Sequence, residues 1–350
     1  MSPADAMARA LALAARGRGR TSPNPLVGAV IVRDGVVLSE GFHRGAGNPH
    51  AEVEALRTLG GKAEGATIYV TLEPCCHHGR TPPCTEALLA SGVARVVVAM
   101  VDPDPRVSGQ GIEALRAAGL SVEVGLMEAE ARACNEAWLM ARQRQRPFVV
   151  LKAGATLDGR IASTTGESRW ITGPAARQRV HELRDQLDAV LVGAGTLRAD
   201  DPQLTTRLPG GRHATAVILD TQLSISADAA VLSAGCPVIL ACAEDAPARD
   251  LPATILRLPR GAHGLDLHAL MRALVDRNLY SLLVEGGGQV HRAFVEAGLV
   301  DRLLLFLAPK ALAAGPGWLG GPGYSLAAAP QWRLTAVEAL QGDALLTLEP

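Results

Sequence analysis

Aromatic residues are scarce in this sequence of 350 residues, where Phe, Trp and Tyr together make up 3%. Surfaces on which single-stranded nucleic acid stacks are therefore few. The sequence also lacks an excess of either charge, because 34 basic side chains balance 35 acidic ones. This balance argues against nucleic acid as the main partner, which requires a basic surface. No apolar run approaches the length of a membrane span, so we expect neither a nucleic-acid nor a membrane partner.

Cysteine is also infrequent, with six residues in the chain. The Ala- and Leu-rich stretch Met7–Ala15 is followed by Arg16, Arg18 and Arg20 and is preceded by no basic residue, so we expect the first helix of a folded domain and not a signal peptide. Cysteines without an export signal indicate a reducing compartment, and we predict a cytoplasmic protein. A clustered cysteine pair is then more typical of metal binding or catalysis than of a disulfide.

The length predicts two domains. In the first half, strands alternate with helices, which indicates a sheet covered by helices. The predicted strands are Val27–Val32, Val36–Ser39, Thr67–Leu72, Ala94–Val101 and Ser121–Val124, and the predicted helices are His50–Leu59, Cys84–Ala90, Ile112–Ala118 and Glu128–Ala141. A polar, basic break over residues 142–147 places the boundary after residue 146, giving domains 1–146 and 147–350.

A second alternating series of strands and helices follows the break. Its clearest strands are Phe148–Leu151, Ala189–Val192, Ala216–Leu219, Leu282–Glu285 and Leu303–Ala308, its clearest helices are Ala175–Leu187 and Leu267–Arg277, and Arg333–Leu348 is expected to close the chain as a hairpin.

The most specific motif is His50-Ala51-Glu52, followed by Pro74-Cys75 and then Cys84. An H-x-E with a later P-C-x-x-C is the signature of zinc deaminases, although eight residues separate the two cysteines here. One imidazole and two thiolates hold zinc with a fourth position open for water. Glu52 would take a proton from that water and pass it to the departing amine. Since residues two apart on a helix do not face each other, the pair converges only if His50 lies in the first turn.

Other side chains near the motif leave the ligand set open. We favour Cys75 because it follows Pro74, but a fourth protein ligand would close the site and remove the need for Glu52. The competing ligands are Cys76, His77 and His78. The remaining cysteines have no metal-like spacing and are predicted to be buried apolar residues, namely Cys134, Cys236 and Cys242.

The second half contains a glycine-rich turn, Gly286–Gly288, between a predicted strand and the helix Gln289–Ala297. Backbone N–H groups of such a turn form a phosphate cradle, and the alternative is a plain tight turn. A second small-residue turn, Gly193–Thr196, also follows an apolar strand. Arg184 and Arg207 are each able to hold a phosphate through two hydrogen bonds.

These motifs resemble the bifunctional deaminase/reductase family of riboflavin biosynthesis over nearly the whole chain. In the first half the resemblance lies in residues 21–28, in the motif around His50, and in Leu72–Cys84, whose spacing of the two cysteines is this family's own. In the second half the resemblance lies in residues 151–153, 157–162, 168–172, 193–196, 201–205, 284–287 and 308–310.

The resemblance implies an α/β protein with an N-terminal cytidine-deaminase-like three-layer domain and a C-terminal dihydrofolate-reductase-like domain. The first domain would replace an amine of 2,5-diamino-6-(ribosylamino)-4(3H)-pyrimidinone 5'-phosphate by oxygen, with zinc as cofactor and Glu52 as the catalytic proton shuttle. The resemblance implies that its pocket is lined by Asn24, His43, Arg80 and Thr81.

The second domain would then use NADPH to reduce the ribosyl group to ribityl, giving 5-amino-6-(5-phosphoribitylamino)uracil. The family's NADPH contacts fall here on Gly154, Trp170, Thr196, Asp200, Thr221, Gly287, Gly288, Gln289, Val290, His291, Arg292 and Ala293. Its ribosyl phosphate contacts fall on Ser168, Arg184, Leu204, Arg207 and Glu285. The family also implies a homo-oligomer, a dimer or tetramer, assembled through the reductase domain.

Two other functions compete with this interpretation. A zinc-dependent tRNA or nucleoside deaminase with an unrelated appended domain would need a basic face, which the neutral chain does not provide. A zinc-stabilised binding module without catalysis would need four protein ligands.

Overall fold

The computed structural model describes residues 1–78, 82–104, 107–262 and 264–350, and the chain divides into two compact units. Unit 1 comprises Met1–Arg144 and unit 2 comprises Gln145–Pro350, so the division falls two residues before the predicted boundary. Among the described residues, no helix has the length and apolar character needed to cross a membrane.

Unit 1 is built on a sheet whose strands lie in the order β2-β1-β3-β4-β5. Strand β1 is antiparallel to both of its neighbours, and β3, β4 and β5 are parallel. The elements are α1 (Pro3–Ala15), β1 (Gly28–Arg33), β2 (Val36–Phe42), α2 (Ala51–Arg57), β3 (Thr67–Val70), α3 (Cys84–Ser91), β4 (Arg95–Val98), α4 (Gln110–Ala117), β5 (Ser121–Val124), α5 (Glu128–Cys134) and α6 (Glu136–Arg144).

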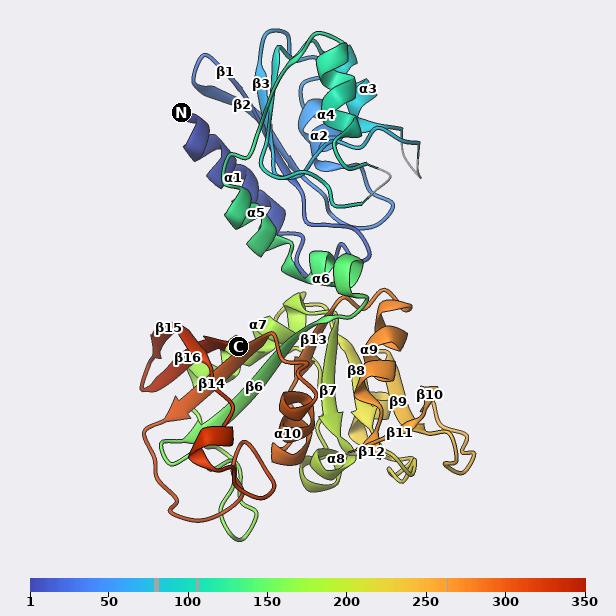
Figure 1. The fold of residues 1–350 in the computed structure, drawn as a ribbon, viewed down its shortest axis with the longest axis vertical. Coiled ribbons are helices and arrows are strands. Elements are labelled where there is room, and N and C mark those ends of the chain that lie inside the picture. The colour runs from blue at the N-terminus through green and yellow to red at the C-terminus, as the bar shows by residue number, and fades with distance from the viewer. Residues whose placement is uncertain (79–81, 105–106, 263) are drawn as a thin grey trace. The chain divides into compact units, whose positions relative to one another are not determined.

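Helices cover both faces of this sheet, with α1 and α5 on one side and α2, α3 and α4 on the other (Figure 1). Two glycines allow α1 and α2 to pack closely against the sheet. A Cβ on Gly28 would lie 2.0 Å from the carbonyl oxygen of Ala10 in α1, and one on Gly41 would lie 2.3 Å from that of Ala51 in α2. Gly41 pairs with Ala29, the neighbour of Gly28, so the two glycines face opposite sides of the sheet. The three-layer arrangement predicted for this domain is therefore confirmed.

One predicted element of unit 1 is wrong. The helix expected over Glu128–Ala141 is two helices, α5 and α6, which meet at Asn135. The Asn135 side chain is buried, accepts a hydrogen bond from the Leu26 N–H (2.8 Å) and donates one to the Leu26 carbonyl (2.9 Å). This pairing across 109 positions of sequence fixes the break between the two helices.

Unit 2 contains a larger sheet in the order β10-β9-β8-β7-β13-β6-β14-β16-β15. Its neighbouring strands are parallel from β10 to β14, and β16 and β15 add an antiparallel hairpin at one edge. The strands are β6 (Phe148–Thr156), β7 (Ala189–Gly193), β8 (Thr215–Leu219), β9 (Val238–Ala243), β10 (Thr254–Leu258), β13 (Ser281–Val284), β14 (Arg302–Ala308), β15 (Arg333–Leu340) and β16 (Asp343–Glu349).

Helices and short elements complete unit 2. The two predicted helices are confirmed as α7 (Pro174–Gln186) and α9 (Leu267–Val275), and the predicted hairpin is confirmed as β15 and β16. Helix α8 (Ala194–Asp200) begins within residues that were expected to form a turn. The remaining elements are α7 (Pro174–Gln186), α8 (Ala194–Asp200), η1 (Ala230–Ser233), β11 (Arg260–Gly261), β12 (Gly264–Leu265), α9 (Leu267–Val275), α10 (Gly288–Glu296) and η2 (Leu326–Ala328).

The central strands of unit 2 are apolar because both of their faces are covered. Leu151, Leu191, Val217 and Leu282 are each 0% exposed and belong to one core with Phe294 of α10. Parallel strands align their carboxyl ends at one edge of the sheet, where ligands bind in folds of this kind. The turns after β7, β8 and β13 all lie at that edge.

Candidate active sites

Three side chains of unit 1 converge at the ends of separate elements. His50 is the N-cap residue of α2, Cys75 lies in the loop after β3, and Cys84 is the first residue of α3. One nitrogen and two sulfur atoms lie within 4.8 Å of one another. The His50 Nδ1 atom is 3.1 Å from the Cys84 Sγ and 3.5 Å from the Cys75 Sγ.

These distances fit a tetrahedral zinc site. Zn–S and Zn–N bonds of ordinary length would hold the sulfur and nitrogen ligands about 3.6 Å apart. His50 Nδ1 is the nitrogen that faces both sulfur atoms. One imidazole and two thiols therefore fit zinc in both chemistry and spacing.

Glu52 lies beside this cluster because α2 begins where it does. The His50 backbone is still extended (φ −70°, ψ 163°), so His50 and Glu52 are not held on different faces of a helix. The Glu52 side chain is 3% exposed, and burial raises its pKa, while the charge of His50 opposes the rise. A carboxyl whose pKa is raised towards neutrality suits proton transfer in both directions.

The two thiols differ in their electrostatics. A hydrogen bond from the Cys84 thiol, aided by hydrogen bonds from His50 and the Cys84 backbone N–H, lowers the pKa of Cys75 to about 4. The same hydrogen bond, together with burial, raises the pKa of Cys84. A divalent cation between them would displace the remaining proton, since thiolates are the form that binds metal.

The competing ligands do not join the cluster. Among the residues that the structure describes, it comprises His50, Cys75 and Cys84, and leaves out Cys76 and His77. His78 lies instead near Glu86, at 3.3 Å. Three protein ligands leave one tetrahedral position open, as catalytic zinc requires.

The other cysteines only partly match their prediction. Cys242 is buried as expected, but Cys134 and Cys236 are half-buried. Neither takes part in the metal cluster among the described residues.

Two of the predicted pocket residues of unit 1 lie together beside the cluster. The ring of His43 packs edge-on against that of His50, with centroids 5.5 Å apart. The Pro49 carbonyl accepts a hydrogen bond from His43 Nδ1 (3.1 Å), which leaves Nε2 to accept one from the Asn24 amide (3.0 Å). Burial lowers the pKa of His43, which favours this neutral form. Arg80 and Thr81 lie outside the described residues.

Glu73 is a residue of this site that the sequence analysis did not single out. Its carboxylate is buried and accepts hydrogen bonds from the backbone N–H groups of Asp102, Gly109, Gly111 and Ile112 at 2.9 to 3.3 Å. The acceptor lies one residue before Pro74-Cys75 and binds the first turn of α4. It therefore anchors the cysteine loop to a helix N-terminus. A glutamate preceding Pro-Cys was the available sequence signal.

In unit 2, the glycine-rich turn leads into α10 as predicted. Gly287 is the N-cap residue, and α10 has no side-chain cap and no acidic residue in its first turn. The Gly287 N–H donates to the Thr196 hydroxyl (3.3 Å), which joins this turn to the start of α8. A Cβ on Gly288 would lie 2.5 Å from the Gly317 carbonyl oxygen, so this glycine also serves packing. An uncapped helix start without carboxylates fits an anionic cofactor.

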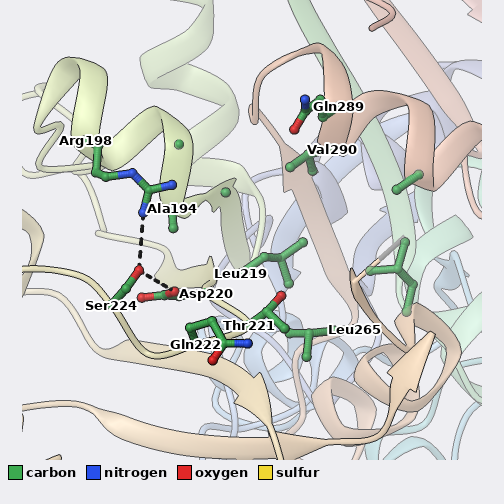
Figure 2. Close-up of a pocket in the computed structure, with 14 residues that line it drawn as sticks. Ala194, Arg198, Leu219, Asp220, Thr221, Gln222, Ser224, Leu265, Gln289 and Val290 are labelled. Atoms are coloured by element: carbon green, nitrogen blue, oxygen red, sulfur yellow. Dashed lines mark hydrogen bonds between the residues drawn. The ribbon is translucent and has the colours of Figure 1, made fainter. Parts of the chain in front are cut away.

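Beside this turn lies a cavity of about 320 Å³ (Figure 2). Of the predicted cofactor residues, Thr221, Gln289, Val290 and Ala293 line it. His291 is buried against the Trp318 carbonyl, and the Arg292 side chain pairs with Glu296. Gly287 and Thr196 contact each other and do not line the cavity, but they are close in sequence to the lining residues Gln289 and Gly195. Three other predicted cofactor residues do not line the cavity. Gly154 lies on β6, Trp170 is exposed, and Asp200 is the last residue of α8.

Part of the predicted phosphate-binding set forms a buried ion cluster. Arg184 donates to Glu285 through Nε (2.7 Å) and Nη2 (3.0 Å), and Lys152, not predicted, lies 3.2 Å from the same carboxylate. Although burial opposes it, these two cations hold the pKa of Glu285 well below its usual range. Arg184 is therefore already paired.

The remaining residues of the set are spread around the same unit. The Ser168 hydroxyl donates to Asp200 (3.4 Å), which joins a predicted substrate residue to a predicted cofactor residue. Leu204 is buried and Arg207 is exposed.

Two known families match the chain, one in each of its two units. Residues 2–100 match the model described as the cytidine and deoxycytidylate deaminase zinc-binding region. Residues 147–346 match the RibD C-terminal domain.

Known proteins match over the full length. The riboflavin biosynthesis protein RibD of Escherichia coli K12 is 44% identical, with 98% of each chain covered. The structure of Acinetobacter baumannii RibD superposes with a TM-score of 0.90 at 39% identity, covering 99% of this chain and 98% of that one. The diaminohydroxyphosphoribosylaminopyrimidine deaminase/5-amino-6-(5-phosphoribosylamino)uracil reductase of Thermotoga maritima superposes with a TM-score of 0.91 at 38% identity and the same coverage. The chain belongs to the RibD family of bifunctional deaminase/reductase proteins of riboflavin biosynthesis.

Proposed function

We propose that residues 1–146 deaminate the diaminopyrimidinone ribosyl phosphate and that residues 147–350 then reduce its ribosyl group to ribityl with NADPH. The observation that carries the first step is the convergence of His50, Cys75 and Cys84 beside the buried carboxyl of Glu52. The match of residues 147–346 to the RibD C-terminal domain supports the second.

In the deaminase site, bound zinc supplies a water of lowered pKa. We assign its ligation to His50 Nδ1 and the sulfur atoms of Cys75 and Cys84. Glu52 accepts the proton as the water oxygen bonds to the ring carbon, and returns it to the amine nitrogen as the C–N bond breaks. Ammonia leaves, and the carboxyl regains its starting state.

We assign substrate orientation in this site to Asn24 and His43. The His43 ring is held as a neutral donor to Pro49, and its Nε2 accepts from Asn24. This pairing fixes both side chains next to the metal ligands, which is the rigidity that positioning a ring requires. The assignments of Arg80 and Thr81 to the same pocket rest on the resemblance alone.

In the reductase site, bound NADPH would supply the hydride that reduces the ribosyl C1. The uncapped start of α10, with Gly287 as N-cap, suits the anionic cofactor, as does the neighbouring Thr196 hydroxyl. We assign the substrate phosphate to Arg207, which is exposed, together with Arg184, which Glu285 holds in place.

We also propose a homo-oligomeric, cytoplasmic protein. Strand β15 lies at the sheet edge and exposes Leu334 (53%) and Val337 (64%), which supports assembly through the reductase domain. All six cysteines are free, as expected in a reducing compartment.

Mass spectrometry of the pyrimidine tests the proposal. The zinc-loaded protein should exchange amine for oxygen without NADPH, and the product should gain two hydrogens when NADPH is added. The Glu52→Gln variant should retain zinc but lose the exchange, because the amide cannot accept the proton. Glu54→Gln, on the same helix, is the matched control and should remain active. Zinc-loaded wild-type protein without exchange would refute the deaminase assignment.

A further inference from the structure

The cavity beside α10 has two unlike sides. Its apolar side is formed by Leu219, Leu265, Leu267, Val290 and Ala293. Its polar side is formed by Arg198, Thr221, Gln222 and Ser224, which come from α8 and from the turn after β8 (Figure 2). An apolar wall facing a polar rim suits a nucleoside whose flat base packs on the wall and whose sugar substituents meet the rim.

Arg198 gives this rim its positive charge. Its side chain is exposed and extends from α8 towards Ser224, whose hydroxyl accepts a hydrogen bond from Nη1 at 3.3 Å. Within the described part of the chain, no carboxylate lies within ion-pair distance of this guanidinium. An arginine at a cavity mouth without an acidic partner is available to an anionic ligand.

Asp220 also lines this cavity, but its carboxylate is buried and bonded to its own turn. It is 3% exposed and accepts from the Ser224 hydroxyl (3.0 Å) and from the Ile225 N–H (2.8 Å). A free carboxylate at a strand end typically accepts from a ribose 2′-hydroxyl and repels a phosphate there. Asp220 instead shapes the turn that presents Ser224 to Arg198.

We propose that Arg198, supported by Ser224, binds the 2′-phosphate of the adenosine half of NADPH and thereby selects NADPH over NADH. The inference rests on the proposed use of a nicotinamide dinucleotide by unit 2. A planar guanidinium binds two oxygens of a phosphate at once, and Ser224, which donates to Asp220 and accepts from Arg198, holds the guanidinium at the rim. NADH has a hydroxyl in place of the phosphate, so it gains nothing from the positive charge.

Equilibrium binding to the full-length protein tests this assignment. Titration calorimetry would compare NADPH with NADH, and 2′,5′-ADP with 5′-ADP, for wild-type protein and for Arg198→Ala. In Arg198→Ala, the loss of charged hydrogen bonds should weaken the binding of NADPH and 2′,5′-ADP by about ten- to a hundredfold. The binding of NADH and 5′-ADP should stay within about twofold of the wild-type affinity, because neither molecule has a 2′-phosphate.

Two further variants sharpen the comparison. Arg198→Lys should recover part of the affinity for NADPH, since it restores charge but not the planar fork. Arg277→Ala removes an exposed arginine after α9 and should change neither ligand pair. Retained reduction by Arg198→Ala at saturating NADPH would show that the reaction site is intact.

The outcomes separate this inference from the function on which it rests. Equal losses for NADPH and NADH in Arg198→Ala would place the arginine on the diphosphate and overturn the assignment. Unchanged NADPH affinity would overturn it as well, while leaving reduction by NADPH in force. Wild-type protein that bound neither dinucleotide would refute the proposed reductase, and with it this inference.

Discussion

Acid should destabilise unit 2 through a single buried histidine, His291. Its side chain is 2% exposed, its Nδ1–H donates to the Trp318 carbonyl at 2.7 Å, and its Nε2 has no hydrogen-bond partner within the described structure. Burial, helped by the charge of Lys152, lowers the pKa of His291 to about 4. In the unfolded chain the imidazole takes up a proton near its ordinary pKa of 6.5.

The pH dependence of the folding stability follows from the difference between these two pKa values. As the pH falls from 6.5 towards 4, only the unfolded chain binds the proton, so folding stability contributed by His291 is lost at up to ~1.4 kcal/mol per pH unit. Near pH 5 the loss amounts to roughly 2 kcal/mol relative to neutral pH. The stability is fully present above pH 6.5, where the imidazole is neutral in both states.

Urea unfolding followed by tryptophan fluorescence, at pH 8 and pH 5, would measure this loss. His291→Asn keeps an N–H where Nδ1 donates but cannot titrate, so its stability should fall by about 2 kcal/mol less than that of wild type over this range. His268→Asn, on the exposed face of α9, is the matched control and should follow wild type. Identical pH dependence of wild type and His291→Asn would refute the reasoning.

The remaining predictions concern unit 1. Removal of zinc by a chelator should abolish the exchange of amine for oxygen and leave reduction of the deaminated intermediate unchanged, as mass spectrometry would show; loss of both reactions would contradict separate sites. Asn135→Leu should lower the free energy of unfolding by about 2 to 4 kcal/mol, because the N–H and carbonyl of Leu26 lose their partners. Denaturant unfolding would measure it, and an unchanged midpoint would show that water replaces the amide.

Much of the metal site could be predicted because its residues are tied to local signals. His50 follows Pro49, Cys84 begins a helix, and Cys75 follows a strand, so each lies at an element end where the backbone fixes its position. From the spacing, His50 and Glu52 were expected to converge only if His50 lay in the first turn of the helix, and His50 is the N-cap residue of α2.

What could not be predicted depends on contacts between distant positions. Asn135 reads as an ordinary helical residue until Leu26, 109 positions away, is placed beside it. Lys152 reads as a surface side chain on a strand until Glu285 and Arg184 surround it. Arg198 belongs to no recognisable sequence motif. It lines a cavity only because the fold brings α8 beside the turn that contains Ser224.

The hydrogen bonds that Asp220 makes within its own turn affect how the cofactor preference of this enzyme could be changed. Removing Arg198 takes away the attraction for a phosphate but exposes no acceptor for the hydroxyl of NADH, because the Asp220 carboxylate is buried and bonded to Ser224 and Ile225. A variant that accepts NADH must also release this carboxylate from its turn. If Arg198 selects NADPH as proposed, cofactor preference also depends on the local fold of residues 220–225, and we expect a switch to require at least two substitutions.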